Sequence, residues 1–124
     1  MVEREGRIQI ELPVEKEFAR LLRLMVSGIA SRMNFNVDAV DDLKIAVEEA
    51  YLMAMRRGVV APLTVAFIMR PDRLQIDFAG QGTAEAGEAQ SDSFGSFILD
   101  AVIDELQVDQ NAGSFDLKLT KYLS

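Results

Sequence analysis

The segment DAVDDLKIAVEEAYLMAMRRG, Asp38 to Gly58, has the clearest helical pattern in the chain. Its apolar positions recur every three or four residues, which predicts one buried stripe: Val40, Leu43, Val47, Ala50, Tyr51 and Ala54. We expect Asp38 to cap the start of this helix and Gly58 to end it in a left-handed conformation. A second face carries Glu49 and Met53 one turn apart. A carboxylate and a thioether therefore share a face beside the predicted core.

Strands are predicted on both sides of this helix. Alternating or strand-forming residues occupy Arg7 to Leu12, Thr64 to Met69, Leu74 to Ala79 and Phe115 to Leu123. In the third of these segments the apolar residues share one face, so that Gly80 continues this face and Asp77 lies on the other. The turn chemistry of Arg70-Pro71-Asp72 joins the second and third segments in an antiparallel hairpin.

Two further helices complete the pattern. From Val14 to Met33 one face holds Phe18, Leu21, Leu22, Met25, Ile29 and Met33, with Asn34 as the stop. After a polar segment from Gly80 to Ser93, expected to be a mobile loop, Ser91 or Ser93 caps a helix whose apolar face is Phe94, Phe97, Ile98, Ala101, Val102 and Leu106. The order of elements predicts a two-layer α+β sandwich, with helices on one face of a mostly antiparallel sheet.

The length of 124 residues, without a break in composition, predicts one domain over residues 1–124. No apolar run reaches the roughly 20 residues that span a bilayer, and no signal segment is present, so we expect a cytoplasmic protein. Without cysteine or histidine, any chemistry depends on carboxylates, hydroxyls or a bound ion. The net charge of −7 argues against direct binding to nucleic acid.

The segments VDDLKIAVEEAYLMAM, LQIDFAGQG, FGSFILDAVIDEL and LKLTKYL, in this order, resemble the bacterial anti-sigma factor and serine-kinase family of the GHKL ATPase superfamily. The resemblance covers essentially the whole chain. It implies the Bergerat, or histidine-kinase-like ATPase, fold, in which ATP and magnesium lie between the central helix and a lid loop. The activity it implies is that of a serine/threonine protein kinase acting on an anti-sigma-factor antagonist.

The residues that carry the chemistry depart from the family pattern. Glu49 matches the catalytic base, but Met53 stands where the family has a magnesium-binding asparagine. A thioether is a poor ligand for this hard ion, so we expect Met53 to fill the vacated pocket. Without the resemblance, Glu49 would be an ordinary carboxylate on a helix surface, because no partner for catalysis is near it in sequence.

The adenine-binding motif is altered as well. The family's aspartate aligns with Gly80, giving Gly80-Gln81-Gly82, and glycine has no side-chain acceptor. Losing such a charged hydrogen bond costs roughly 1.5 to 3 kcal/mol. Asp77 restores the acceptor only if the strand register slips by an odd number of residues. The glycine-rich motif before the last helix keeps Gly95 but has Ser93 in place of another glycine.

The resemblance therefore implies a regulatory protein that acts by protein binding, with a degenerate nucleotide site and no cofactor. Its expected partners are a sigma factor, an antagonist or both. We also expect a homodimer that forms through the first helix and first strand. Arg20, Arg23 and Leu24 on the first helix are the expected docking surface, although for either arginine taken alone a solvated helix face is the preferred interpretation. Two alternatives remain: an active ATP-dependent kinase, and a small-molecule sensor that uses the vacated cavity.

Overall fold

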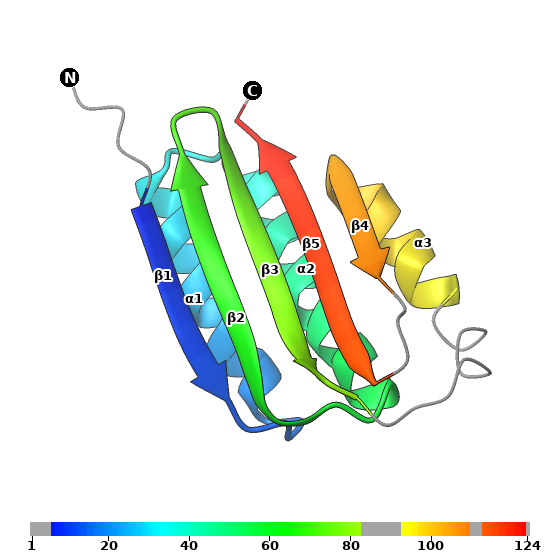
Figure 1. Ribbon diagram of the computed structural model, residues 1–124. Helices are drawn as coiled ribbons and strands as arrows, with labels where there is room; N and C mark the ends of the chain where they lie inside the picture. The colour runs from blue at the N-terminus through cyan, green and yellow to red at the C-terminus, as the bar shows by residue number, and fades with distance from the viewer. Residues whose placement is uncertain (1–5, 83–92, 110–112, 124) are drawn as a thin grey trace.

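The structure, a computed structural model, describes residues 6–82, 93–109 and 113–123. Figure 1 shows the elements of this part of the chain in order. They are β1 (Gly6–Leu12), α1 (Phe18–Arg32), α2 (Val37–Arg56), β2 (Val60–Arg70), β3 (Arg73–Gln81), α3 (Ser93–Val102), β4 (Glu105–Asp109) and β5 (Ser114–Tyr122).

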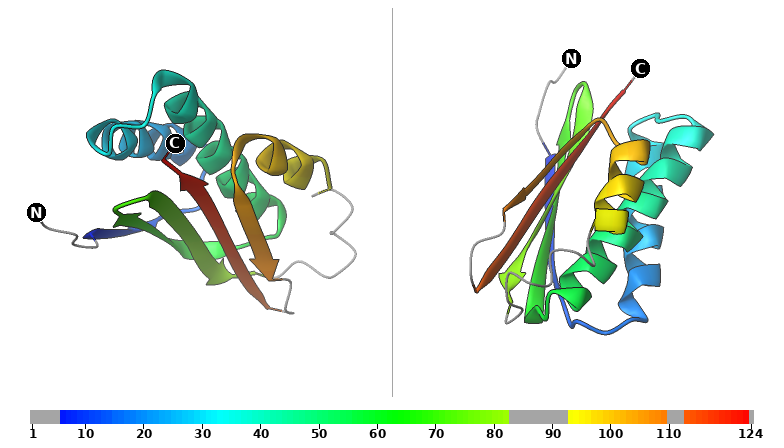
Figure 2. Two further views of the ribbon diagram at one scale, coloured as in Figure 1. Left: turned by 90° about the horizontal axis from the view of Figure 1, so that it is seen from above. Right: turned by 90° about the vertical axis from the view of Figure 1, so that its right-hand side faces the viewer.

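The strands form one sheet in the order β1-β2-β3-β5-β4, and every neighbouring pair is antiparallel. All three helices cover the same face of this sheet, as both views in Figure 2 show. The predicted two-layer α+β sandwich is confirmed. An amphipathic helix can bury its apolar stripe only against another element, and here that element is the apolar face of the sheet.

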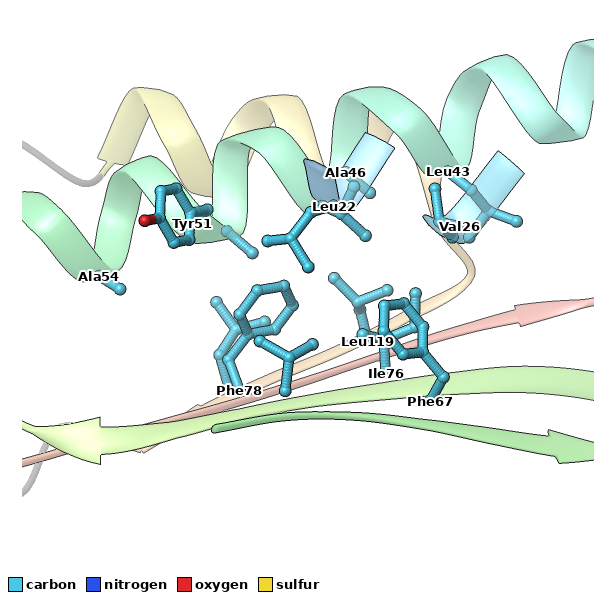
Figure 3. Packing of buried hydrophobic residues seen from close by; sticks show 14 of the residues in the cluster. Leu22, Val26, Leu43, Ala46, Tyr51, Ala54, Phe67, Ile76, Phe78 and Leu119 are labelled. Atoms are coloured by element: carbon cyan, nitrogen blue, oxygen red, sulfur yellow. The ribbon is translucent and has the colours of Figure 1, made fainter. Parts of the chain in front are cut away.

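The core lies between the two layers. Leu22 and Val26 of α1 and Leu43 of α2 point toward Phe67 and Ile76 of the sheet (Figure 3), and all five side chains are fully buried. The register of β3 is the predicted one, because its buried residues are Leu74, Ile76 and Phe78. The opposite face of the sheet is mixed: Ala66 and Ile68 of β2 lie there, flanked by polar residues of the neighbouring strands such as Gln9, Gln75 and Asp77.

The ends of the helices differ in detail from the prediction. α2 begins at Val37, and its cap is Asn36, whose Oδ1 accepts a hydrogen bond from the Ala39 N–H at 2.8 Å. Asp38 is therefore not the cap; it lies in the first turn, where its charge still favours the positive end of the helix dipole. Gly58 and Asn34 both have a φ of 70°, as expected for residues that end helices in the left-handed conformation.

The third helix is present as predicted, but its end and its buried face were predicted incorrectly, and the strand after it was missed. α3 ends at Val102, and the residues after it form β4, so that Leu106 belongs to a strand. Phe97 is 70% exposed and Ala101 is exposed, whereas Leu99 and Ile103 are buried. The apolar face of α3 is thus rotated relative to the prediction, because Leu99, not Phe97, enters the core.

Smaller differences concern the first helix and the predicted loop. α1 begins at Phe18, and Leu21 is exposed instead of buried. β3 continues through Gly80 to Gln81, two residues past the predicted end. The expectation of a mobile loop falls mainly on residues 83–92, and Ser91 as a cap falls there too, outside the described residues. None of the helices in the described part of the chain has the length and apolar character required to cross a membrane.

Candidate functional site

Three α2 side chains form the centre of the candidate site. Glu49, Met53 and Arg56 follow one another at intervals of four and three residues, which places them on one helix face. Arg56 Nη2 donates to Glu49 Oε2 at 2.6 Å. The Glu49 side chain is only 14% exposed and Met53 is fully buried. An ion pair therefore lies beside a buried apolar side chain on the same face of α2.

The first turn of α3 rests directly on these side chains. Gly95 is buried, and a Cβ added there would lie 2.5 Å from Glu49 Oε2, 2.9 Å from Arg56 Nη2 and 3.2 Å from Met53 Cε. Real Cβ atoms do not approach other atoms as closely as the first of these distances. All three atoms are the ends of flexible side chains, so a larger residue at position 95 would require these side chains to shift, whereas glycine lets α3 lie against them as they are.

Gly80 lies against a different neighbour. It pairs with Phe115 of β5, and a Cβ added to it would lie 2.6 Å from Cγ1 of Val59, a buried residue just after α2. A Cβ on Gly82 would lie 3.1 Å from the carbonyl oxygen of Arg57. Both glycines therefore pack beside the C-terminal end of α2.

Asp77 does not reach this site. In the observed register it pairs with Lys118 of β5, and Gln75 Nε2 donates to its Oδ1 at 3.0 Å. Its side chain lies on the face of β3 opposite to that of Phe78. The alternative register that would bring Asp77 to the helix side is absent from the described β3.

The structure brings together Glu49, Met53 and Gly95, three of the residues selected from the sequence, and places Gly80 and Gly82 near the end of the same helix. It adds Arg56 and Val59, which the sequence argument missed. The opposite charges of Glu49 and Arg56 at a spacing of seven residues were a usable signal, since that spacing returns to one helix face. Val59 gave no signal, because its contact with Gly80 depends on the packing of β3 beside the end of α2.

The predicted docking residues lie on the exposed side of the helical layer. Arg20 is exposed and Leu24 is 65% exposed, one turn apart on α1. Arg23 differs, because its Nη1 pairs with Glu48 Oε1 of α2 at 3.0 Å. Ile45 of α2 is also exposed and was not selected from the sequence.

Tyr51 anchors the connection between β1 and α1 to the central helix. Its hydroxyl accepts from the Glu15 N–H at 2.9 Å and lies 2.7 Å from the Pro13 carbonyl and 2.6 Å from the Glu15 carbonyl, to which it can donate. Burial of the ring raises the pKa of Tyr51 above its ordinary value of 10.0. Tyr51 therefore holds the connection between β1 and α1 against α2. It takes no part in the candidate site.

Among the described residues, no group of three or more acidic, histidine or cysteine side chains is arranged to hold a metal ion. The group that pairs with Glu49 is instead the guanidinium of Arg56, and the thioether side chain of Met53 lies with both of them against Gly95.

A search against protein-family models finds no match. The chain is similar to individual proteins named serine-protein kinase RsbW. It is 30% identical to the one from Bacillus velezensis, over 94% of this chain and 86% of that protein. It is 28% identical to the one from Bacillus subtilis over the same shares, and 28% identical to one from Listeria monocytogenes over 100% of this chain and 92% of that protein.

A crystal structure of the RsbU and RsbW domains of a Mycobacterium tuberculosis protein has the same fold, with a TM-score of 0.77 and 17% identity. The match covers 95% of this chain and 32% of that longer chain. The fold is thus that of the GHKL class of ATPase-like domains, as the resemblance implied. Within this class, the sequence similarity over nearly the full length shows that the chain belongs to the RsbW family.

Proposed function

We propose that this chain is an anti-sigma-type regulatory protein that acts by binding other proteins, with a nucleotide site that no longer holds ATP and magnesium. The observation that supports it most is the contact of Gly95 with Glu49, Arg56 and Met53. In the family arrangement the nucleotide lies between the central helix and the lid segment, and here the first turn of α3 meets α2 directly.

The residues present do not fit ATP with magnesium. The side chain at the metal-ligand position is the buried thioether of Met53, and magnesium requires oxygen ligands. The carboxylate of Glu49 is already paired with a cation, Arg56, which would repel a divalent ion beside it. Gly80 has no acceptor for an adenine amino group, and Val59 occupies the space where a longer side chain would begin.

By analogy with the family, the partners are a sigma factor, an antagonist protein or both. The docking surface would comprise Arg20, Arg23 and Leu24, extended by Ile45 on the neighbouring helix. Arginine beside exposed leucine suits a protein interface, because arginine is enriched among the residues that contribute most to binding and burial of leucine removes apolar surface from water. We also propose that the protein is cytoplasmic, that the whole chain forms one domain and that two copies form a homodimer.

The test is a calorimetric titration with purified sigma factors and antagonist proteins of the same cell, in the absence of nucleotide. We expect one of them to bind, and Arg20→Glu to weaken this binding at least about tenfold. Lys118→Glu is the control, because it makes the same charge change at an exposed position in β5, outside the first helix and first strand. If Arg20→Glu binds every partner as the natural protein and Lys118→Glu do, the proposed surface is wrong.

An active kinase is the second candidate, because Glu49 is retained and the relatives are named serine-protein kinases. Phosphoryl transfer depends on positioning and on neutralisation of the phosphate charge. Incubation of the natural protein and of Glu49→Gln with labelled ATP and each antagonist separates the candidates. Phosphorylation of a serine or threonine by the natural protein, abolished in Glu49→Gln, would establish the kinase; we expect none with either protein.

A further inference from the structure

We propose that Glu49, Arg56 and Met53 form an internal clamp that holds α3 on α2 without any nucleotide, so that the position of α3 is built into the fold. The inference rests on the proposed function, since it explains what occupies the altered site. These three side chains and Gly95 are called the clamp below.

In the clamp, side chains of α2 lie directly beneath the first turn of α3. Three side chains from successive turns of α2 converge within 3.2 Å of the point where a Gly95 Cβ would be. One is apolar and fully buried, and the other two satisfy each other in a 2.6 Å charge-assisted hydrogen bond. The first turn of α3 thus covers a neutralised pair and a thioether, not an open polar site.

The rest of α3 is anchored separately. Leu99 is fully buried and Ile103, one turn later, is nearly so. These residues hold the C-terminal end of the helix in the core, while Gly95 in the first turn is buried against α2. The clamp therefore determines whether the N-terminal half of α3 stays docked or opens locally.

The clamp depends on the positive charge of Arg56. A lone Glu49 carboxylate under a helix would be costly, because a buried charge needs a partner. Arg56 supplies a cation from the same helix, seven residues away, and this requires no bound ion. The Arg56 guanidinium thus engages Oε2 of Glu49 at 2.6 Å and orients this carboxylate beneath the first turn of α3.

Hydrogen–deuterium exchange of the amides of residues 95–103 tests the clamp in the intact protein. In the natural protein without nucleotide we expect the amides from Phe97 onward, which have intrahelical acceptors, to be protected. Millimolar ATP with magnesium should leave the exchange of the segment unchanged. Arg56→Ala is expected to speed exchange in this segment about three- to tenfold, because the pair is partly exposed and its loss opens only one end of the helix.

Arg23→Ala is the matched control, because it removes an arginine that makes a comparable ion pair with a glutamate of the same α2 helix, away from α3. It should leave exchange in residues 95–103 unchanged. Gly95→Ala gives a second, opposite test: helix propensity alone predicts slower exchange, whereas the clamp predicts faster exchange. Faster exchange in both clamp variants but not in the control supports the inference.

Two results overturn it and point to different errors. If Arg56→Ala and Gly95→Ala leave exchange in residues 95–103 unchanged, the clamp is wrong, while the proposed function stands. If the natural protein lacks protection in this segment until ATP and magnesium are added, the clamp is wrong and the proposed loss of nucleotide binding is wrong with it.

Discussion

Val59 Cγ1 lies 2.6 Å from the position that a Cβ on Gly80 would take, so the valine fills the space of any side chain at residue 80. This contact links Gly80, which we propose stands in place of the family's adenine-binding aspartate, to the end of α2. The proposed substitution is thus accompanied by a packed neighbour. An aspartate cannot be restored at position 80 unless Val59 is also shortened.

The first prediction follows from this overlap. Gly80→Ala is expected to lower the free energy of unfolding by about 1 to 3 kcal/mol, the usual effect of overpacking a core. In a Val59→Ala background the same change should cost less than about 0.5 kcal/mol, because the overlapping methyl group is gone. Urea unfolding of the four proteins gives the coupling energy.

Gly28→Ala is the control for the intrinsic effect of removing a glycine. Gly28 lies in α1, and a Cβ added there would meet no atom within 4 Å. This change should raise the free energy of unfolding by about 0.5 to 1 kcal/mol. Equal effects of Gly80→Ala with and without Val59 would contradict the steric explanation.

The second prediction concerns Met53. Because its side chain is fully buried under α3, Met53→Asn is expected to lower the free energy of unfolding by about 2 to 4 kcal/mol, through lost apolar burial and an unpaired amide. Met53→Leu conserves volume and should cost less than about 1.5 kcal/mol. A tolerated asparagine would show that residue 53 faces a solvated pocket instead of filling one.

The third prediction concerns Tyr51. Tyr51→Phe removes the hydroxyl that holds the Pro13 to Glu15 connection, and we expect a loss of about 1 to 2 kcal/mol in the free energy of unfolding. Tyr122→Phe provides the comparison, because Tyr122 is exposed and its change should stay within about 0.5 kcal/mol. Similar losses in the two variants would contradict an anchoring role for Tyr51.

The fourth prediction is a dependence of stability on pH in the alkaline range. Burial raises the pKa of Tyr51 in the folded protein above the value of 10.0 for a free tyrosine. The stability linked to the protonated hydroxyl is therefore complete below pH 10.0 and is lost as the pH rises through the folded-state pKa. Between about pH 9 and about pH 11, the free energy of unfolding should fall less in Tyr51→Phe than in the natural protein. Parallel pH profiles would contradict this assignment.

Much of the fold could be predicted from periodicity. Leu43 and Val47 lie on one helical stripe, which fixes the buried face of α2. The alternation of Leu74, Ile76 and Phe78 fixes the buried face of β3, and these two faces define the layers. β4 was missed because Leu106 and Val108 continue a helical pattern from α3 as well as they begin a strand. The choice between these depends on pairing with β5, which is a tertiary contact.

The candidate site was predictable only in part, for a similar reason. Glu49 and Met53 are one turn apart on a well-defined helix, so sequence alone could place them together. The roles of Arg56 and Val59 depend on where α3 and β3 dock against α2, and local pattern does not carry this information. Phe97 was assigned to the core because it is apolar, but the position of Gly95 against α2 turns it outward.

The central claim is that the protein does not bind ATP with magnesium, and titration calorimetry measures this most directly. The matched control is a variant with Met53→Asn, Gly80→Asp and Val59→Ala, in which the third change makes room for the restored aspartate. We predict no heat of binding for the natural protein at millimolar ATP, and measurable binding by the control if it folds. Magnesium-dependent binding by the natural protein at micromolar ATP would contradict the account.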